Sequence, residues 1–202
     1  MQRVLYLGVL LCVAFSLLAA GCSKKVVSRV EPEDVIDLSG RWNDTDSRLV
    51  SEEMIVDCLN HPWLTKHTTK TSKDPVVIVG AIRNKSSEHI AVGTFIADIE
   101  RAFINSGHIE VVASALERGD LRDEKADQAR FATIESLKKQ GQELGADYMM
   151  TGQINTIVDQ EKGDKVVFYQ VDLNLIDIET NAKVWAGQKE IKKLVEKKRV
   201  SY

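Results

Sequence analysis

Cysteine, proline and histidine are scarce in this sequence, with three, three and four copies respectively in 202 residues. The cysteines lie far apart, at positions 12, 22 and 58, which excludes a disulfide-rich scaffold. No two histidines are four residues apart, and the four do not fall into the spacing of a zinc site. We therefore expect this protein to bind no metal and no cofactor.

Motifs for catalysis are missing as well. The sequence has no Gly-x-Ser-x-Gly, and the glycines at 80, 141 and 145 lack the spacing and the lysine of a phosphate-binding loop. Four carboxylates cluster near the start of an expected helix: Asp44, Asp46, Glu52 and Glu53. A helix dipole stabilises acidic residues in that place, so the cluster needs no catalytic role. The sequence predicts a protein that is not an enzyme and that acts by binding.

Neither sign of charge dominates, because 27 Lys and Arg stand against 30 Asp and Glu. A formal net charge of −3 gives no electrostatic argument for a nucleic-acid partner. The C-terminal tail, residues 194–202, is basic, and the stretch from Lys189 to Arg199 holds six basic residues. We expect a frayed, solvated end there, with contact to anionic phosphates as the alternative.

An apolar run from Val4 to Ala20 follows Arg3 and is shorter than the roughly 20 residues of a membrane-spanning helix. It ends in the stretch Leu-Leu-Ala-Ala-Gly-Cys-Ser at 17–23, which matches the pattern cut by bacterial lipoprotein signal peptidase. We expect residues 1–21 to be removed as a signal peptide. Cys22 would then carry an S-diacylglycerol and an N-acyl chain. The alternative is an ordinary secretory peptide cut near Ala20.

Removal of residues 1–21 leaves 181 residues, in which Cys58 is the only unmodified thiol. We expect Cys58 to be buried in the core, with an intermolecular disulfide as the alternative. Residues 22–45 are interpreted as a lipidated tether with one proline, Pro32, which reaches roughly 80 Å at full extension. Ser23 follows the lipidated cysteine, an arrangement that in enteric bacteria sends a lipoprotein to the outer membrane.

A globular domain is predicted over residues 46–193, beginning with an amphipathic helix capped by Asp46. Its apolar positions recur at four-residue spacing: Val50, Met54 and Cys58. Pro62 is expected to end this helix.

A loop is predicted from Leu64 to Asp74, with His61 and His67 at the surface. The continuous apolar run over 76–82 indicates a central strand that is buried on both faces. Within it, Gly80 is interpreted as a place where a helix packs closely.

The sequence then predicts a helix from Thr94 that ends at Gly107, and a short strand from Ile109 to Ala113. Residues 114–145 carry no strand signal. They are expected to hold a short helix capped by Ser114, a charged stretch, and a helix from Thr133 to Gly145.

Three strands are predicted in the last third of the domain, over 146–158, around 167–175 and over 183–191. The middle one alternates strictly between apolar and polar residues, and a turn over 177–181 follows it. The fold class is therefore α+β: one domain with a mixed sheet of four to five strands, about four helices and a C-terminal antiparallel meander.

The chain resembles the penicillin-binding protein activator lipoproteins of the LpoB family over roughly residues 38–193. The resemblance depends on several short motifs together: Ser-Gly-Arg-Trp-Asn-Asp-Thr-Asp-Ser-Arg at 39–48, Met54, Pro62-Trp63, Val-Gly-Ala-Ile-Arg-Asn at 79–84, Gly-Ala-Asp-Tyr-Met-Met-Thr-Gly at 145–152, and Asp177 to Trp185. The fold that it implies is similar to the N-terminal domain of the translocation protein TolB.

The resemblance implies a lipoprotein on the periplasmic side of the outer membrane. Its partner would be a class A penicillin-binding protein, a bifunctional peptidoglycan synthase, whose glycan polymerisation it stimulates. The tether departs from enterobacterial members, which have a long proline-rich one. The alternative function is therefore a non-enzymatic envelope assembly lipoprotein, with the same fold and a different partner near the membrane.

Trp42 and Trp63 flank the first helix and are candidates for the partner surface, since tryptophan is enriched at binding hot spots. We favour the alternative that both of them cover the core.

Overall fold

The computed structural model describes residues 26–131 and 144–196. The chain divides into two compact units, Met1–Asp34 and Val35–Tyr202. In the first unit, the described residues 26–34 contain a turn in which the Asp34 N–H donates to the Glu31 carbonyl at 3.1 Å. All the helices and strands below belong to the second unit. No helix among the described residues is long and apolar enough to cross a membrane.

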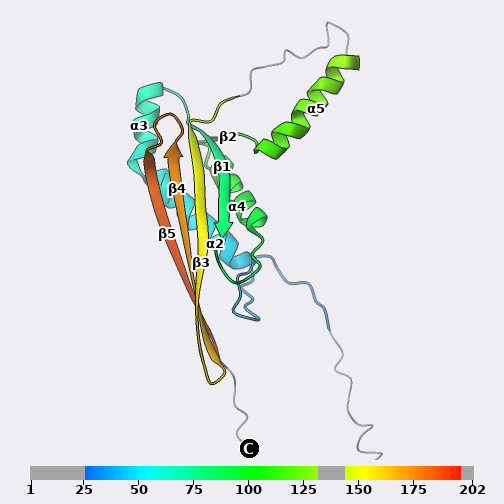
Figure 1. Ribbon diagram of the computed structural model, residues 1–202, viewed down its shortest axis with the longest axis vertical. Coiled ribbons are helices and arrows are strands. Elements are labelled where there is room, and N and C mark those ends of the chain that lie inside the picture. Colours follow the sequence, from blue (N-terminus) through cyan, green and yellow to red (C-terminus); the bar gives the residue numbers. More distant parts are fainter. Residues whose placement is uncertain (1–25, 132–143, 197–202) are drawn as a thin grey trace, which may run out of the picture. The chain divides into compact units, whose positions relative to one another are not determined.

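A five-stranded mixed sheet, in the order β2-β1-β3-β4-β5, organises the second unit (Figure 1). The strands are β1 (Val76–Asn84), β2 (Glu110–Val111), β3 (Tyr148–Glu161), β4 (Asp164–Asp177) and β5 (Lys183–Val195). β1 is parallel to both β2 and β3, whereas β3, β4 and β5 form an antiparallel meander. The predicted α+β class, mixed sheet and C-terminal meander are confirmed.

The strict alternation in β4 produces the centre of the core. Five side chains on its inner face are fully buried: Val167, Tyr169, Val171, Leu173 and Leu175. β3 and β4 pair without interruption from Tyr148↔Asp177 to Glu161↔Asp164. Lys162 and Gly163 close this hairpin with positive φ angles of 50° and 99°, as a type I′ turn requires. The hairpin is therefore longer at its tip than the sequence predicts.

Helices α2 (Asp44–Asn60) and α4 (Val92–Ser106) pack side by side on one face of the sheet (Figure 1). The predicted apolar stripe of α2 is buried, including Cys58 at 0% exposure. Asn43 caps α2, because its side chain accepts the Asp46 N–H at 3.0 Å while Asp46 accepts the Asn43 N–H at 2.9 Å. The prediction that Asp46 is the N-cap was therefore wrong by three positions. Gly107, with φ of 70°, ends α4 as predicted.

The predicted loop after Pro62 is a helix, α3 (Pro62–Thr71). Proline favours the first turn of a helix, where its missing N–H has no intrahelical partner. Trp63 and His67, four residues apart, face the core at 4% and 9% exposure. The prediction of His67 at the surface was therefore wrong, whereas His61 is exposed as expected.

One helix, α5 (Ala115–Phe131), replaces the two shorter segments predicted there. Ser114 and Glu117 form a capping box at its start, because the Ser114 N–H donates to Glu117 at 2.8 Å and the Glu117 N–H donates to Ser114 Oγ at 3.4 Å. Of the helix predicted from Thr133 to Gly145, residues 133–143 lie outside the described residues.

Three other local predictions change. β5 continues to Val195, so residues 189–195 belong to the sheet instead of a frayed end, and residues 197–202 lie outside the described residues. β2 is shorter than the predicted strand from Ile109 to Ala113. A Cβ on Gly80 would lie 3.2 Å from the Met149 side chain and the Met150 carbonyl, so this glycine accommodates the neighbouring strand and not a helix.

Candidate functional site

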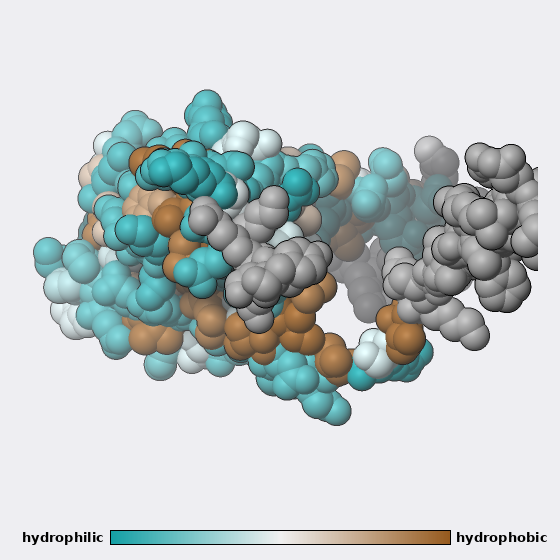
Figure 2. Space-filling model, turned by 90° about the horizontal axis from the view of Figure 1, so that it is seen from below, coloured by the Kyte–Doolittle hydropathy of each residue, from teal (hydrophilic) through white to brown (hydrophobic). Residues whose placement is uncertain are grey.

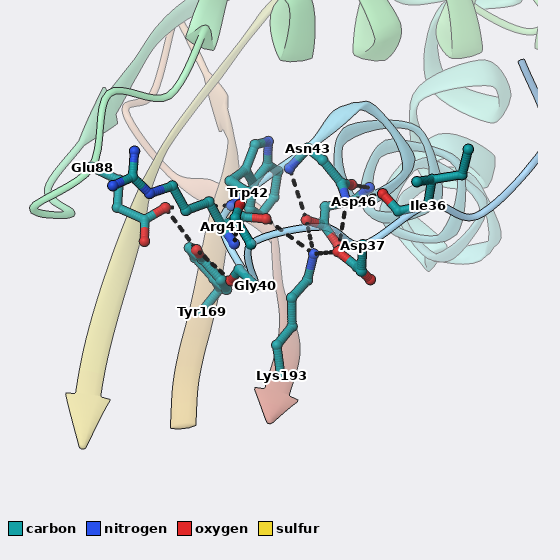
Figure 3. Close-up of polar contacts among 11 residues, drawn as sticks. Ile36, Asp37, Gly40, Arg41, Trp42, Asn43, Asp46, Glu88, Tyr169 and Lys193 are labelled. Atoms are coloured by element: carbon teal, nitrogen blue, oxygen red, sulfur yellow. Dashed lines mark hydrogen bonds and ion pairs between the residues drawn. The ribbon is translucent and has the colours of Figure 1, made fainter. Parts of the chain in front are cut away.

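The first candidate region is the segment that joins the N-terminal unit to the sheet. We call it the tether junction and define it as residues 37–46 with Glu88, Tyr169 and Lys193 (Figure 3). Gly40 enters it with a φ of 66°, and a side chain there would collide with Val195 of β5. The chain therefore needs glycine at position 40 to turn from the tether onto the sheet.

Glu88 holds the tether junction on the sheet. Its Oε2 accepts the Tyr169 hydroxyl at 2.7 Å and the Trp42 N–H at 3.3 Å. The Trp42 ring stands edge-on to Phe95 and Tyr169, with centroids 6.0 and 5.6 Å apart. Burial and the negative charge of Glu88 keep the pKa of Tyr169 well above its ordinary value. Tyr169 therefore remains a neutral donor, and Trp42 packs against the core.

Lys193 of β5 makes a second set of contacts that hold the tether junction on the sheet. Its Nζ lies 2.6 Å from carboxylate oxygens of Asp37 and Asp46 and donates to the Arg41 carbonyl at 3.2 Å (Figure 3). The side chains of Lys193 and Asp46 are each 9% exposed. Burial alone would lower the pKa of Lys193, but the hydrogen bonds that it donates to both carboxylates outweigh this effect, and the pKa lies above its ordinary value. The tether is thus attached to one fixed point on β5.

The surface at this end of the domain is partly apolar. Figure 2 views the molecule from below Figure 1, where the β3–β4 turn lies, and shows hydrophobic residues gathered between hydrophilic ones. Ile157 of β3 and Leu194 of β5 are 67% and 63% exposed.

The second candidate region is a cleft of about 630 Å³ at the other end of the same strands. We call it the distal cleft; it is lined by α3, by residues 146–148 where β3 begins, and by residues 177–184 around the β4–β5 turn. Aromatic rings build its inner wall. Trp63 and His67 both stand edge-on to Tyr148, with centroids 4.9 and 5.4 Å apart.

Hydrogen bonds make this wall rigid. Trp63 Nε1 donates to the Cys58 carbonyl at 2.8 Å, which ties α3 to the end of α2. His67 Nδ1 lies 3.0 Å from the Tyr148 hydroxyl, and its Nε2 is 3.8 Å from Asp147. Burial raises the pKa of Tyr148, and the nearby Asp177 and Asp147 raise it further.

Two carboxylates of the distal cleft accept hydrogen bonds from neighbouring backbone segments. Asp147 Oδ2 accepts the Val76 N–H at 2.9 Å. Asp177 Oδ1 accepts the Thr180 N–H at 2.7 Å and the Thr180 hydroxyl at 2.8 Å. The backbone hydrogen bond from Thr180 is the main reason that the pKa of Asp177 lies below its ordinary value. These two acids therefore help to shape the distal cleft.

The predicted site residues occupy different places. Cys22 lies outside the described residues. Trp42 is half-buried in the tether junction, and Trp63 is 4% exposed in the wall of the distal cleft, so both rings pack on the core of this chain. Sequence reasoning missed His67; its spacing of four from Trp63, directly after a proline, was the available signal. Burial raises the pKa of the Cys58 thiol to about 12. Among the described residues, no group of three or more histidines, cysteines and carboxylates could hold a metal ion.

Comparison with known proteins gives a family and several structures of low similarity. The LpoB C-terminal domain from Escherichia coli is 14% identical, covers 65% of this chain and 94% of that one, and has a TM-score of 0.35. A lipoprotein from Neisseria meningitidis is 15% identical over 62% of this chain and 88% of that one, with a TM-score of 0.39. A PelC dodecamer from Paraburkholderia phytofirmans is 18% identical over 60% and 72%, with a TM-score of 0.35.

A search of curated proteins finds no match. The family model described as peptidoglycan-synthase activator LpoB matches residues 46–191, which is well over half of the chain. This chain therefore belongs to the LpoB family of peptidoglycan-synthase activators.

Proposed function

We propose that this protein is an outer-membrane lipoprotein that binds a class A penicillin-binding protein and raises its rate of glycan polymerisation. The observation that carries the proposal is the match of residues 46–191 to a family of peptidoglycan-synthase activators. The lipoprotein cleavage pattern before Cys22 supports the export and membrane anchoring of the domain. Activation of an enzyme by docking needs no catalytic group in the activator, which agrees with a sequence that lacks catalytic motifs.

The short tether sets the reach of this activator. The second compact unit begins at Val35, and 13 residues from Cys22 to Asp34 span about 45 Å at full extension. β5 is 13 residues long, which adds about 43 Å from one end of the strand to the other. The contact with the synthase must therefore lie within this reach, about 90 Å at most, of the membrane that carries the lipid.

The anchor has a direct test. Cys22→Ala should give an unlipidated protein that is lost from the membrane fraction, measured by fractionation and mass spectrometry of the mature N-terminus. Cys12→Ala, inside the apolar run and away from the cleavage site, is the matched control and should stay anchored. Membrane partitioning that survives Cys22→Ala would contradict the anchor.

The activity is tested with lipid II and the class A synthase of the same bacterium. The full mature chain, purified in detergent, is added at increasing concentration, and the polymerisation rate is followed. We expect a saturable increase in rate together with direct binding. A synthase that neither binds nor changes its rate would contradict the proposed function and favour an envelope assembly role, which cross-linking in intact cells would detect as other neighbours.

A further inference from the structure

We propose that the distal cleft is the surface on which the synthase docks, and that its occupant is an acidic segment of the synthase. This inference rests on the proposed function and adds the surface and the chemistry of the contact. Three properties of the distal cleft support it: its position, its charges and its rigidity.

The position of the distal cleft follows from the strand register. Lys193, which fastens the tether, pairs with Val167 near the hairpin end of the sheet, whereas Lys183 of the distal cleft pairs with Ile176 at the other end. Ten residues of β5 separate the two lysines, or about 33 Å of strand. Figure 1 shows α3 and the β4–β5 turn at one end of the sheet and the β3–β4 turn at the other. A tether pulled toward the outer membrane therefore leaves the distal cleft facing away from that membrane.

The charges of the distal cleft favour an acidic partner. Lys66 and Lys70, one helical turn apart on α3, and Lys183 at the start of β5 all line it and are all exposed. Among the described residues, none of their three ammonium groups lies within ion-pair distance of a carboxylate. Lys70 is near enough to Asp177 to lower the pKa of that acid, yet makes no direct contact.

The carboxylates that line the distal cleft make no direct ion pair with these lysines. Asp147 accepts the Val76 N–H of β1 and Asp177 accepts the Thr180 N–H of the β4–β5 turn, whereas Glu179 is exposed on that turn. Two lysines of β5 outside the distal cleft do have such partners: Lys189 pairs with Glu53, and Lys193 pairs with Asp37 and Asp46. The three lysines of the distal cleft are therefore available to pair with carboxylates brought by a partner.

The walls of the distal cleft are preformed. Trp63, His67 and Tyr148 pack edge-on and are tied to the core by hydrogen bonds. Ile178, which is 42% exposed, adds an apolar contact at the rim. A preformed hollow lets a partner bind without ordering α3 or the turn, which reduces the entropic cost of association.

The test is a triple charge reversal, Lys66→Glu, Lys70→Glu and Lys183→Glu, in the full mature chain. Binding to the cognate synthase is measured together with activation of lipid II polymerisation. We expect the dissociation constant to rise by about tenfold or more, because three exposed ion pairs become repulsive contacts. The binding of the unaltered chain should also weaken with added salt, more steeply than that of the variant.

The matched control is Lys85→Glu, Lys162→Glu and Lys192→Glu, which makes the same change in net charge at exposed positions outside the distal cleft. The control should bind and activate like the unaltered chain. A neutral set, Lys66→Gln, Lys70→Gln and Lys183→Gln, guards against misfolding and should show a smaller loss in the same direction. Circular dichroism must be unchanged for all three sets.

The outcomes separate the two proposals. If the unaltered chain activates and the cleft reversal binds equally well, the docking surface is refuted and the proposed function stands. If the control reversal weakens binding as much as the cleft reversal, the effect is net charge and the docking surface is again refuted. If the unaltered chain neither binds nor activates, both proposals fail. If the cleft reversal loses binding to isolated peptidoglycan and keeps binding to the synthase, the cleft recognises the wall, and the acidic synthase segment is refuted.

Discussion

Lys193→Met is the substitution with the largest expected effect on the tether junction. It removes the cation that faces Asp46, where both side chains are 9% exposed. Breaking a buried ion pair by removing one partner costs about 3–5 kcal/mol, because the other charge stays buried. Asp37 adds less than about 1 kcal/mol, since its side chain is 44% exposed and screened by water. Asp46 keeps the hydrogen bond from the Asn43 N–H, so we expect a loss near the lower end, about 3 kcal/mol in the free energy of unfolding.

Urea unfolding followed by tryptophan fluorescence measures this loss, because Trp42 lies in the same region. Lys189→Met is the matched control: it is the same change on the same strand, at a pair with Glu53 whose side chains are 31% and 62% exposed. An exposed pair contributes about 1 kcal/mol at most. The raised pKa of Lys193 means that its contribution is fully present below the ordinary lysine pKa and is lost as pH rises through the folded value. The difference between the two variants should therefore be constant across neutral pH.

A double variant separates the buried charge from the lost contact. Lys193→Met with Asp46→Asn removes both charges and should be less destabilised than Lys193→Met alone. The account is refuted if Lys193→Met costs no more than Lys189→Met, or if the double variant shows no recovery.

Three further predictions concern the core and the β4–β5 turn. Gly152→Ala should lose about 1–3 kcal/mol in unfolding free energy, because its Cβ would collide with the backbone of β4. Gly93→Ala in α4 should raise the unfolding free energy by up to about 1 kcal/mol, because a Cβ there meets nothing within 4 Å. Cys58 in the mature chain should not react with a thiol reagent at pH 8 until the protein unfolds, since burial raises its pKa to about 12; rapid native labelling or a disulfide dimer would contradict this. Asp177→Asn should remove stability that is present above the ordinary aspartate pKa and is lost as pH falls through the lowered folded pKa. The curves of unfolding free energy against pH for the variant and the unaltered chain should therefore converge in acid. Parallel curves would contradict the role assigned to Asp177.

The regular part of the fold could be predicted because the signals were local and periodic. The alternation through β4 and the four-residue spacing in α2 each reflect one buried face, so they identify both the element and its core side. The end of α4 at Gly107 follows from the left-handed backbone that glycine accepts.

The errors arose where tertiary contacts overrode local preference. The Thr- and Lys-rich stretch of α3 has a weak helix propensity of its own, and it is stabilised because Trp63 and His67 pack against Tyr148. The basic end of β5 was predicted to be a tail because the contacts that order it are far away in sequence. The strand pairs with β4, and Lys193 forms ion pairs with Asp37 and Asp46. Both candidate regions join residues that are distant in the chain, so neither could be assembled from spacing alone.

Photo-crosslinking in living cells shows which end of the domain contacts the synthase. A photoreactive amino acid is placed at position 183 in the distal cleft or at position 192 near the tether junction of the full-length protein. The account predicts an adduct with a class A penicillin-binding protein from position 183 and none from position 192. An adduct from position 192 alone would contradict the docking surface. The absence of any synthase adduct from both positions, with the protein present in the envelope, would contradict the proposed function itself.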